Sequence, residues 1–199
     1  MTTRQVSLLR VAAFSGVALL SACSDQKSAN ENNFVAAINA YFADKPVCLP
    51  AVQYPAEIVV GAFGEGRLRA FDALVGAGLL NREELRRPAA NLGEQRDGPE
   101  VRTIRYMLAD KGRKSLSDRG WCYGVRKVVK IVRFTEPTDA FGARVSEVLY
   151  AYSYAGVPDW AKNNAVIAAF PQLQEVSAAE PPQERVVLVL TNQGWQVGP

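Results

Sequence analysis

The sequence contains no histidine among its 199 residues. Histidine is the usual general base near neutral pH and the commonest zinc ligand, so its absence removes Ser-His and Cys-His nucleophile pairs and most zinc sites. The glycine-rich stretch at residues 61–66 lacks the lysine and the hydroxyl of a phosphate-binding loop. The sequence therefore predicts no catalytic residue, no metal site and no cofactor, and we expect the protein not to be an enzyme.

Long hydrophobic runs are also scarce, and the clearest one stands near the N-terminus. Residues 11–20 carry no charge, and the basic Arg4 and Arg10 precede them. This run is about half of the roughly 20 residues that a spanning helix needs, which is typical of a cleaved signal peptide. No second run is long enough to cross a bilayer. We therefore expect residues 1–22 to be the signal peptide of an exported protein.

Residues 20–23 read Leu-Ser-Ala-Cys, and a polar stretch follows them. This tetrad resembles the lipobox of bacterial lipoproteins, in which signal peptidase II cuts before the cysteine. The resemblance implies that Cys23 is lipidated and that acyl chains such as palmitate anchor the protein in a membrane, with residues 23–33 as a flexible tether. Ser24 stands where an aspartate would favour the inner membrane, so the resemblance favours the outer membrane and a periplasm-facing protein. An ordinary secretory signal that ends beside a cysteine is the alternative.

Cysteine is otherwise limited to Cys48 and Cys122. Two cysteines in an exported protein most simply form one disulfide, because compartments outside the cytosol are oxidising. Such a bridge would close a long loop and would stabilise the folded state by roughly 4 kcal/mol in the chain-entropy description. Two buried free thiols are the alternative.

The first half of the mature chain shows a helical period. Apolar residues recur at helical spacing over residues 34–44 and 67–80, and residues 82–87 would add one more helical turn. A short strand is expected near residues 104–108, where apolar and polar side chains alternate. Residues 34–120 are therefore predicted to be a helical part of the fold.

The second half, residues 121–199, changes to a strand-like period. Residues 125–134 and 145–154 are rich in β-branched and aromatic side chains. Residues 186–190 are apolar throughout and are expected to be a strand buried on both faces. The predicted fold class is therefore α+β, with a helical N-terminal half and an antiparallel β-sheet in the C-terminal half, the two halves forming one domain or two.

Two phrases in the middle of the chain, ALVGAGLL at residues 73–80 and YMLADKGR at residues 106–113, follow a known pattern. They resemble the "ALxxxGLL … YxLTxxGR" pattern of the winged-helix superfamily, although Ala109 stands where that family has threonine. The resemblance implies winged-helix-like topology for this part of the chain. It does not imply a nucleic-acid partner, because an exported lipoprotein meets no DNA and a fold does not carry its function with it.

Charge is the feature of the mature chain that departs most from an even distribution. Residues 101–133 carry ten basic and two acidic side chains, whereas the mature chain as a whole has 21 basic and 20 acidic residues. Such a block can bind an anionic partner. The candidate binding residues are Arg105, Arg113, Arg126, Lys127 and Lys130. An ordinary solvent-exposed strand surface is the alternative, because the basic residues of 125–134 fall on both alternation positions.

These observations predict an acyl-anchored, periplasm-facing lipoprotein of the bacterial cell envelope. We expect a non-enzymatic interaction or scaffold protein, bound to the membrane by its lipid anchor and to an envelope protein as partner, with no nucleic acid. The alternative function is a periplasmic binding module that takes an anionic small molecule, a glycan or a lipid headgroup through the basic block at residues 101–133.

Overall fold

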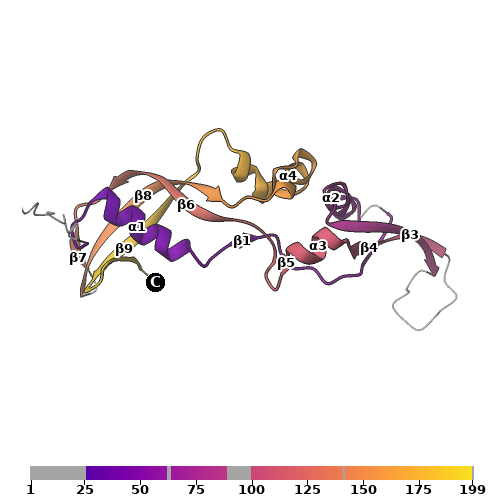
Figure 1. The fold of residues 1–199 in the computed structure, drawn as a ribbon, viewed down its shortest axis with the longest axis horizontal. Helices are drawn as coiled ribbons and strands as arrows, with labels where there is room; N and C mark the ends of the chain where they lie inside the picture. Colours follow the sequence, from indigo (N-terminus) through magenta and orange to yellow (C-terminus); the bar gives the residue numbers. More distant parts are fainter. Residues whose placement is uncertain (1–25, 62–63, 89–99, 141, 199) are drawn as a thin grey trace, which may run out of the picture.

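The computed structural model describes residues 26–61, 64–88, 100–140 and 142–198. Of these residues 44% lie in strands and 30% in helices. The strands form two antiparallel sheets that follow one another along an elongated molecule (Figure 1). The prediction of a helical N-terminal half is therefore wrong, because the described residues before position 120 contain strands between and after their two 12-residue helices.

The larger sheet, which we call the long sheet, is built on two long neighbouring strands, β6 and β8. Its order is β1-β6-β8-β9-β10, with β5 paired to β6 and β7 paired to β8. Its strands are β1 (Val47–Cys48), β5 (Leu116–Ser117), β6 (Gly120–Phe134), β7 (Thr138–Ala140), β8 (Ala143–Ala155), β9 (Gln183–Thr191) and β10 (Gly194–Val197). The strands β6, β8 and β9 contain the stretches that are rich in β-branched and aromatic side chains. Such side chains predict strands because they fit a pleated, half-buried surface.

Helix α1 (Glu31–Phe42) packs on the inner face of the long sheet and contacts both β6 and β10. Phe34 and Ile38 are fully buried there, in a cluster that includes Trp195 of β10. The Asn39 Oδ1 atom accepts a hydrogen bond from the backbone N–H of Val128 at 3.0 Å, so the helix also provides a partner for the edge of β6. The N-terminal helix is thus part of the same hydrophobic core as the C-terminal strands.

The smaller sheet has the order β2-β4-β3 and is covered by helix α2. Its elements are β2 (Ala56–Val59), α2 (Glu65–Gly76), β3 (Leu80–Pro88), β4 (Glu100–Leu108) and α3 (Asp110–Ser115). Phe71 and Leu74 of α2 are buried in one cluster with Ile104 and Tyr106 of β4. We call this part the three-stranded sheet.

In the segment that resembles a winged helix, the helix expected over residues 67–80 forms as α2, but strands stand on both sides of it. A helix-turn-helix needs two consecutive helices, whereas α2 is preceded by β2 and followed by β3. Residues 82–87, predicted as a helical turn, lie inside β3. This edge strand has mostly exposed, charged residues, so it lacks the apolar alternation by which a strand is recognised.

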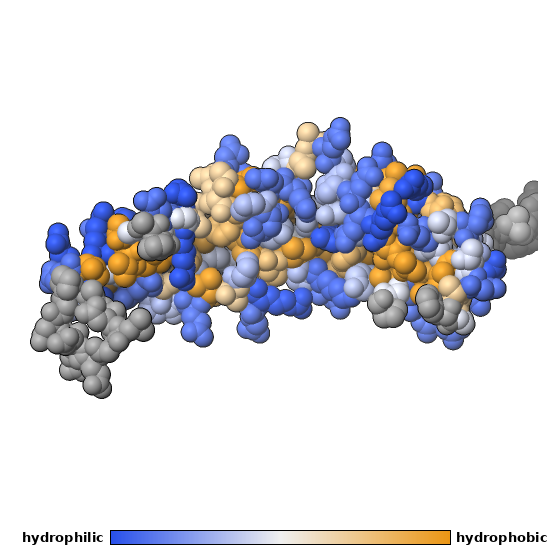
Figure 2. Space-filling view, turned by 180° about the vertical axis from the view of Figure 1, so that it is seen from behind, coloured by the Kyte–Doolittle hydropathy of each residue, from blue (hydrophilic) through white to orange (hydrophobic). Residues whose placement is uncertain are grey.

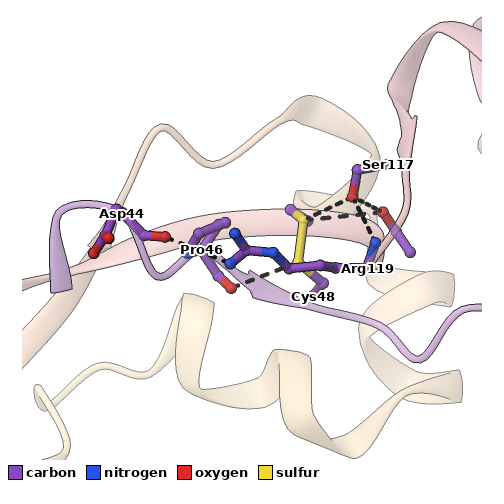
Figure 3. Close-up of a disulfide and its surroundings, with 7 residues drawn as sticks. Asp44, Pro46, Cys48, Ser117 and Arg119 are labelled. Atoms are coloured by element: carbon purple, nitrogen blue, oxygen red, sulfur yellow. Dashed lines mark hydrogen bonds between the residues drawn. A yellow bond between two sulfur atoms is a disulfide. The ribbon is translucent and has the colours of Figure 1, made fainter.

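Segments from both halves of the sequence meet where the two sheets adjoin. Cys48 of β1 lies opposite Cys122 of β6, and the two form a disulfide with an S–S distance of 2.06 Å (Figure 3). Arg119 lies close by and donates to the backbone oxygen of Asp44 at 3.4 Å. The predicted disulfide is therefore confirmed, and it attaches the connection after α1 to the start of the long strand β6.

The chain between β8 and β9 forms three short helices. They are η1 (Asp159–Lys162), α4 (Asn164–Ala169) and η2 (Pro171–Ser177). Trp160 and Leu173 are buried in the same cluster as the residues of α2, so this segment joins the core of the three-stranded sheet. The expected boundary at residue 120 falls at the first residue of β6.

The expected tether overlaps the first turn of α1. Asn30 caps that helix, because its Oδ1 atom accepts a hydrogen bond from the backbone N–H of Asn33 at 2.9 Å. The Trp195 indole N–H lies 3.2 Å from the backbone oxygens of Lys27 and Ser28. The described chain therefore begins against the turn between β9 and β10, at the end of the molecule opposite the three-stranded sheet (Figure 1).

Candidate functional site

Two β-bulges in β6 align three basic side chains on the outer face of the long sheet, the face opposite α1. The register with β8 shifts between Val128 and Lys130 and again between Ile131 and Arg133. Each bulge inserts one extra residue, so the strict alternation that would place Lys127 and Lys130 on opposite faces is broken. The partners of Lys127, Lys130 and Arg133 on β8 are Ser153, Ala151 and Leu149. We call these three cations the basic row.

Three exposed valines accompany the basic row. Val129 is 51% exposed and Val132 is 41% exposed, and both stand at the bulges between members of the row. Val187 of β9 is 47% exposed, which contradicts the expectation that residues 186–190 are buried on both faces. In the view from behind, hydrophobic surface is interrupted by hydrophilic side chains along the molecule (Figure 2). We call the basic row together with these valines the outer patch.

The cations of the basic row have no acidic partner among the residues that the structure describes. On neighbouring strands of the same sheet, Arg185 of β9 pairs with Glu147 of β8 at 3.0 Å. α1 packs on the opposite face, and η2 reaches the sheet through Glu175, which accepts from tyrosines of that inner face. The outer patch is therefore both charged and uncovered by the described elements.

Arg126, also a predicted binding residue, faces the inner side of the sheet. Its Nη1 atom donates to Glu184 Oε2 at 2.5 Å. Its guanidinium lies 4.7 Å from the ring centroid of Tyr152 and 5.5 Å from that of Phe42. A guanidinium held between aromatic faces and a carboxylate is engaged in packing the fold. Arg126 is thus separated from Lys127 by the sheet itself.

The tyrosines of β8 share this inner face with Arg126. Tyr152 and Tyr154 both donate to Glu175 Oε2, at 3.0 and 2.7 Å, and Tyr150 lies 3.2 Å from Glu184 Oε2. Burial is the largest cause that raises the pKa of Tyr150 and Tyr154 above the ordinary value for tyrosine, and the nearby carboxylates act in the same direction. Both hydroxyls therefore stay protonated. The tyrosines thus tie η2 to the long sheet and link β8 to β9 within it.

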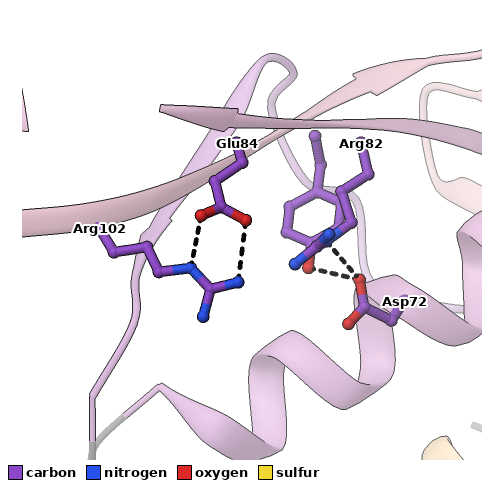
Figure 4. Close-up of polar contacts among 5 residues, drawn as sticks. Asp72, Arg82, Glu84 and Arg102 are labelled. Atoms are coloured by element: carbon purple, nitrogen blue, oxygen red, sulfur yellow. Dashed lines mark hydrogen bonds and ion pairs between the residues drawn. The ribbon is translucent and has the colours of Figure 1, made fainter. Parts of the chain in front are cut away.

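Two arginines of β4, Arg102 and Arg105, are paired with acidic side chains of the neighbouring strands. Arg105 contacts Glu57 at 2.9 Å and Glu83 at 3.3 Å. Arg102 forms two hydrogen bonds with Glu84, at 2.7 and 2.8 Å, and this contact lowers the pKa of the Glu84 carboxyl (Figure 4). Such cross-strand pairs hold the edge strand β3 in place where it has little apolar surface to bury.

Arg113, the remaining predicted binding residue, lies in α3 and contacts Asp110 at 2.9 Å. Figure 1 places α3 and β4 at the opposite end of the molecule from α1 and the second half of β6. The structure therefore brings Lys127 and Lys130 together and places Arg105 and Arg113 elsewhere. Arg133, Val129 and Val132 join the patch although they are not among the binding residues predicted from the sequence. Their signal is the three-residue spacing of Lys127-Val-Val-Lys130-Ile-Val-Arg133.

The predicted lipidation site, Cys23, lies outside the described residues. In the part of the chain that the structure does describe, no helix is long and apolar enough to cross a membrane. No three side chains of the kinds that bind metals come together there to form a metal site. Comparisons with protein-family models, with curated proteins and with solved structures found no match for this chain.

Proposed function

We propose that this protein is an acyl-anchored, periplasm-facing lipoprotein of the bacterial envelope, with the outer membrane as its expected location. Its role in this proposal is non-enzymatic: it holds another envelope protein against the outer patch. The observation that carries the proposal is the outer patch itself, in which bulges bring the cations Lys127, Lys130 and Arg133 into one row beside exposed valines.

The mixture of apolar and basic side chains favours a protein as the partner. Protein interfaces combine an apolar centre with a polar rim, and clustered charges guide the encounter with a surface of opposite sign. Val129 and Val132 supply apolar surface, and the basic row supplies positive charge that no described acid neutralises. The partner that fits is an envelope protein whose acidic groups surround a small apolar area.

The place where the described chain begins supports an orientation relative to the membrane. The Trp195 indole lies within hydrogen-bonding distance of the backbone at Lys27 and Ser28, four and five residues after the predicted lipidation site. In this proposal the turn between β9 and β10 lies near the membrane, and the three-stranded sheet extends away from it (Figure 1). The outer patch then belongs to the membrane-proximal half.

The anchor is tested by the variant Cys23→Ala. We expect this variant to leave the membrane fraction and to appear in the soluble periplasmic extract, because its acyl chains are missing. A Cys23→Ala protein that stays in the membrane fraction after washing with high salt would contradict lipid anchoring.

The interaction is tested by crosslinking in intact cells followed by mass spectrometry of the captured proteins. Charge reversal by Lys127→Glu with Lys130→Glu should remove the main partner. The matched control is Lys111→Glu with Lys114→Glu, which makes the same change in net charge on α3. Loss of the partner in both double variants, or in neither, would contradict docking at the outer patch.

The alternative function is the binding of an anionic small molecule, a glycan or a lipid headgroup. The same geometry limits the residues that can bind such a ligand. Of the predicted binding residues, Arg105, Arg113 and Arg126 each contact a carboxylate, whereas Lys127 and Lys130 pair with no acid in the described part of the chain. If charge reversal leaves the protein partner in place but removes retention on an anionic glycan resin, the alternative replaces the proposal.

A further inference from the structure

A second candidate site lies in the other half of the molecule. A partly enclosed cavity of about 260 Å³ opens between the chain that follows β1, helix α2 and the segment around η2. Its walls are mainly apolar and include Leu49, Val52, Phe71 and Trp121. Its volume lies just below the usual range for small-molecule sites and above the roughly 150 Å³ that benzene fills in an engineered apolar cavity.

The walls of this cavity are held in place by the disulfide and its neighbours. Leu49 follows Cys48 and Trp121 precedes Cys122, and the backbone N–H of Leu49 donates to the backbone oxygen of Trp121 at 2.9 Å. The Trp121 indole N–H donates to the backbone oxygen of Gly112 at 3.2 Å. The ring is therefore fixed, and its polar atom is already satisfied, so it offers the cavity an apolar surface.

Two polar side chains, Tyr54 and Arg67, line the same walls. The Tyr54 hydroxyl is buried and forms no hydrogen bond with any described residue. Arg67 is exposed, forms no ion pair with a described acid and has its guanidinium 5.6 Å from the ring centroid of Phe71. A buried hydroxyl without a partner destabilises the folded protein, so an acceptor supplied by a ligand would offset that cost.

The positive charge of Arg67 also acts on the Tyr54 hydroxyl. Burial raises the pKa of Tyr54 to about 12, while the positive charge of Arg67 acts in the opposite direction. At neutral pH the hydroxyl is therefore protonated and can donate a hydrogen bond, and the guanidinium beside it is positively charged. Both groups are donors, which selects a ligand with a negatively charged acceptor.

We propose that this cavity binds a small monocarboxylate with an apolar body. The carboxylate is held by Arg67 and the Tyr54 hydroxyl, and the body packs against Phe71 and Trp121. This site uses neither the outer patch nor the lipid anchor, so it stands or falls separately from the proposed function.

The probe for this site is octanoate, titrated calorimetrically into the complete chain carrying Cys23→Ala, which remains in solution without its acyl chains. Octanol and octylammonium have the same apolar body with a neutral and a positive head. We expect octanoate to bind at least about tenfold more tightly than octanol, as a charge-assisted hydrogen bond would give, and octylammonium to bind most weakly. Equal binding of all three probes, or no binding of octanoate, would overturn the proposal.

Variants locate the binding in the cavity. Arg67→Leu should weaken octanoate binding about tenfold and leave octanol binding unchanged, and Tyr54→Phe should weaken octanoate binding about fivefold. Ala70→Phe fills the cavity that Ala70 lines and should abolish binding of both probes.

The matched control is Arg69→Leu on the same helix, because Arg69 contacts Glu65 and does not line the cavity. Thermal unfolding of each variant verifies that it is folded. If Arg69→Leu and Arg67→Leu have the same effect, or if folded Ala70→Phe still binds octanoate, the assignment to this cavity is wrong.

Discussion

Arg126 and Lys127 are neighbours in β6 and point to opposite faces of the long sheet. Arg126 donates to Glu184 and lies over the Tyr152 ring on the inner face, whereas Lys127 lies opposite Ser153 on the outer face. Two adjacent basic residues thus have different physical roles. Arg126 contributes to the packing of the fold, and Lys127 contributes charge to a surface that the described elements leave uncovered.

This difference predicts that the same substitution has effects of different size on the free energy of unfolding at the two positions. Arg126→Ala should lower the free energy of unfolding by about 1–3 kcal/mol, because Glu184 loses its partner and the aromatic rings lose their contact. Lys127→Ala should change it by less than about 0.5 kcal/mol, as exposed sites usually do. Urea denaturation of the two variants measures both values. A smaller loss for Arg126→Ala than for Lys127→Ala would contradict this assignment.

The disulfide should contribute strongly to stability, since Cys48 and Cys122 are 74 positions apart in the sequence. In the chain-entropy description a loop of this length corresponds to roughly 4 kcal/mol. We expect the double variant Cys48→Ala with Cys122→Ala to unfold at a markedly lower urea concentration than the oxidised protein, as should the protein after reduction. An unchanged unfolding midpoint under reducing conditions would show that the bridge contributes little.

Two glycines provide a test of close backbone packing. A Cβ atom on Gly112 would lie 1.9 Å from the backbone oxygen of Leu79, whereas a Cβ on Gly76 would meet no atom within 4 Å. Gly112→Ala should therefore destabilise the protein by about 3 kcal/mol or more, because the backbone must move. Gly76→Ala, at the last residue of α2, should be neutral or stabilise by up to about 1 kcal/mol. Thermal unfolding of both variants distinguishes these outcomes.

The buried tyrosines predict a loss of stability at alkaline pH. Burial and the hydrogen bond to Asp72 raise the pKa of Tyr106 from 10.0 to about 12. The protonated form is favoured by folding, so its contribution is complete below pH 10 and is lost as the pH rises through 12. The slope for one such group is at most about 1.4 kcal/mol per pH unit.

This pH dependence is measured by urea denaturation between pH 9 and about pH 12, chosen to span the ordinary and raised pKa of tyrosine. Tyr106→Phe removes the titrating hydroxyl and should flatten the decline in stability, whereas Tyr41→Phe, at a residue that is 39% exposed, should not. An equal slope for the wild type and Tyr106→Phe would contradict the raised pKa.

The strands of the long sheet could be predicted from the sequence because their side chains are of the types that favour strands. Residues 125–134 and 145–154 are rich in β-branched and aromatic side chains, and they form most of β6 and β8. The disulfide could be predicted because Cys48 and Cys122 are the two cysteines that remain after Cys23, so the expectation of export leaves one simple pairing. β3 could not be predicted, because its residues are mostly charged and exposed, and it is held by pairing with β4 along its whole length.

The outer patch could be predicted in part. Charge counting identified Lys127 and Lys130, but strict alternation assigned them to opposite faces, and the bulges that bring them together depend on the pairing with β8. The cavity beside Tyr54 gave no sequence signal, because its walls come from segments between residues 49 and 172 that only the fold brings together.

The most direct test of the central claim is site-specific photocrosslinking in intact cells. A photoreactive residue at Val132, in the outer patch, should capture one recurrent envelope protein. The same residue at Val59, which is 54% exposed on the three-stranded sheet, should capture that protein much less. Strong capture at Val132 that is lost with Lys127→Glu and Lys130→Glu is the result we predict. Equal capture at both positions, or a partner captured at Val59 and not at Val132, would contradict docking at the outer patch.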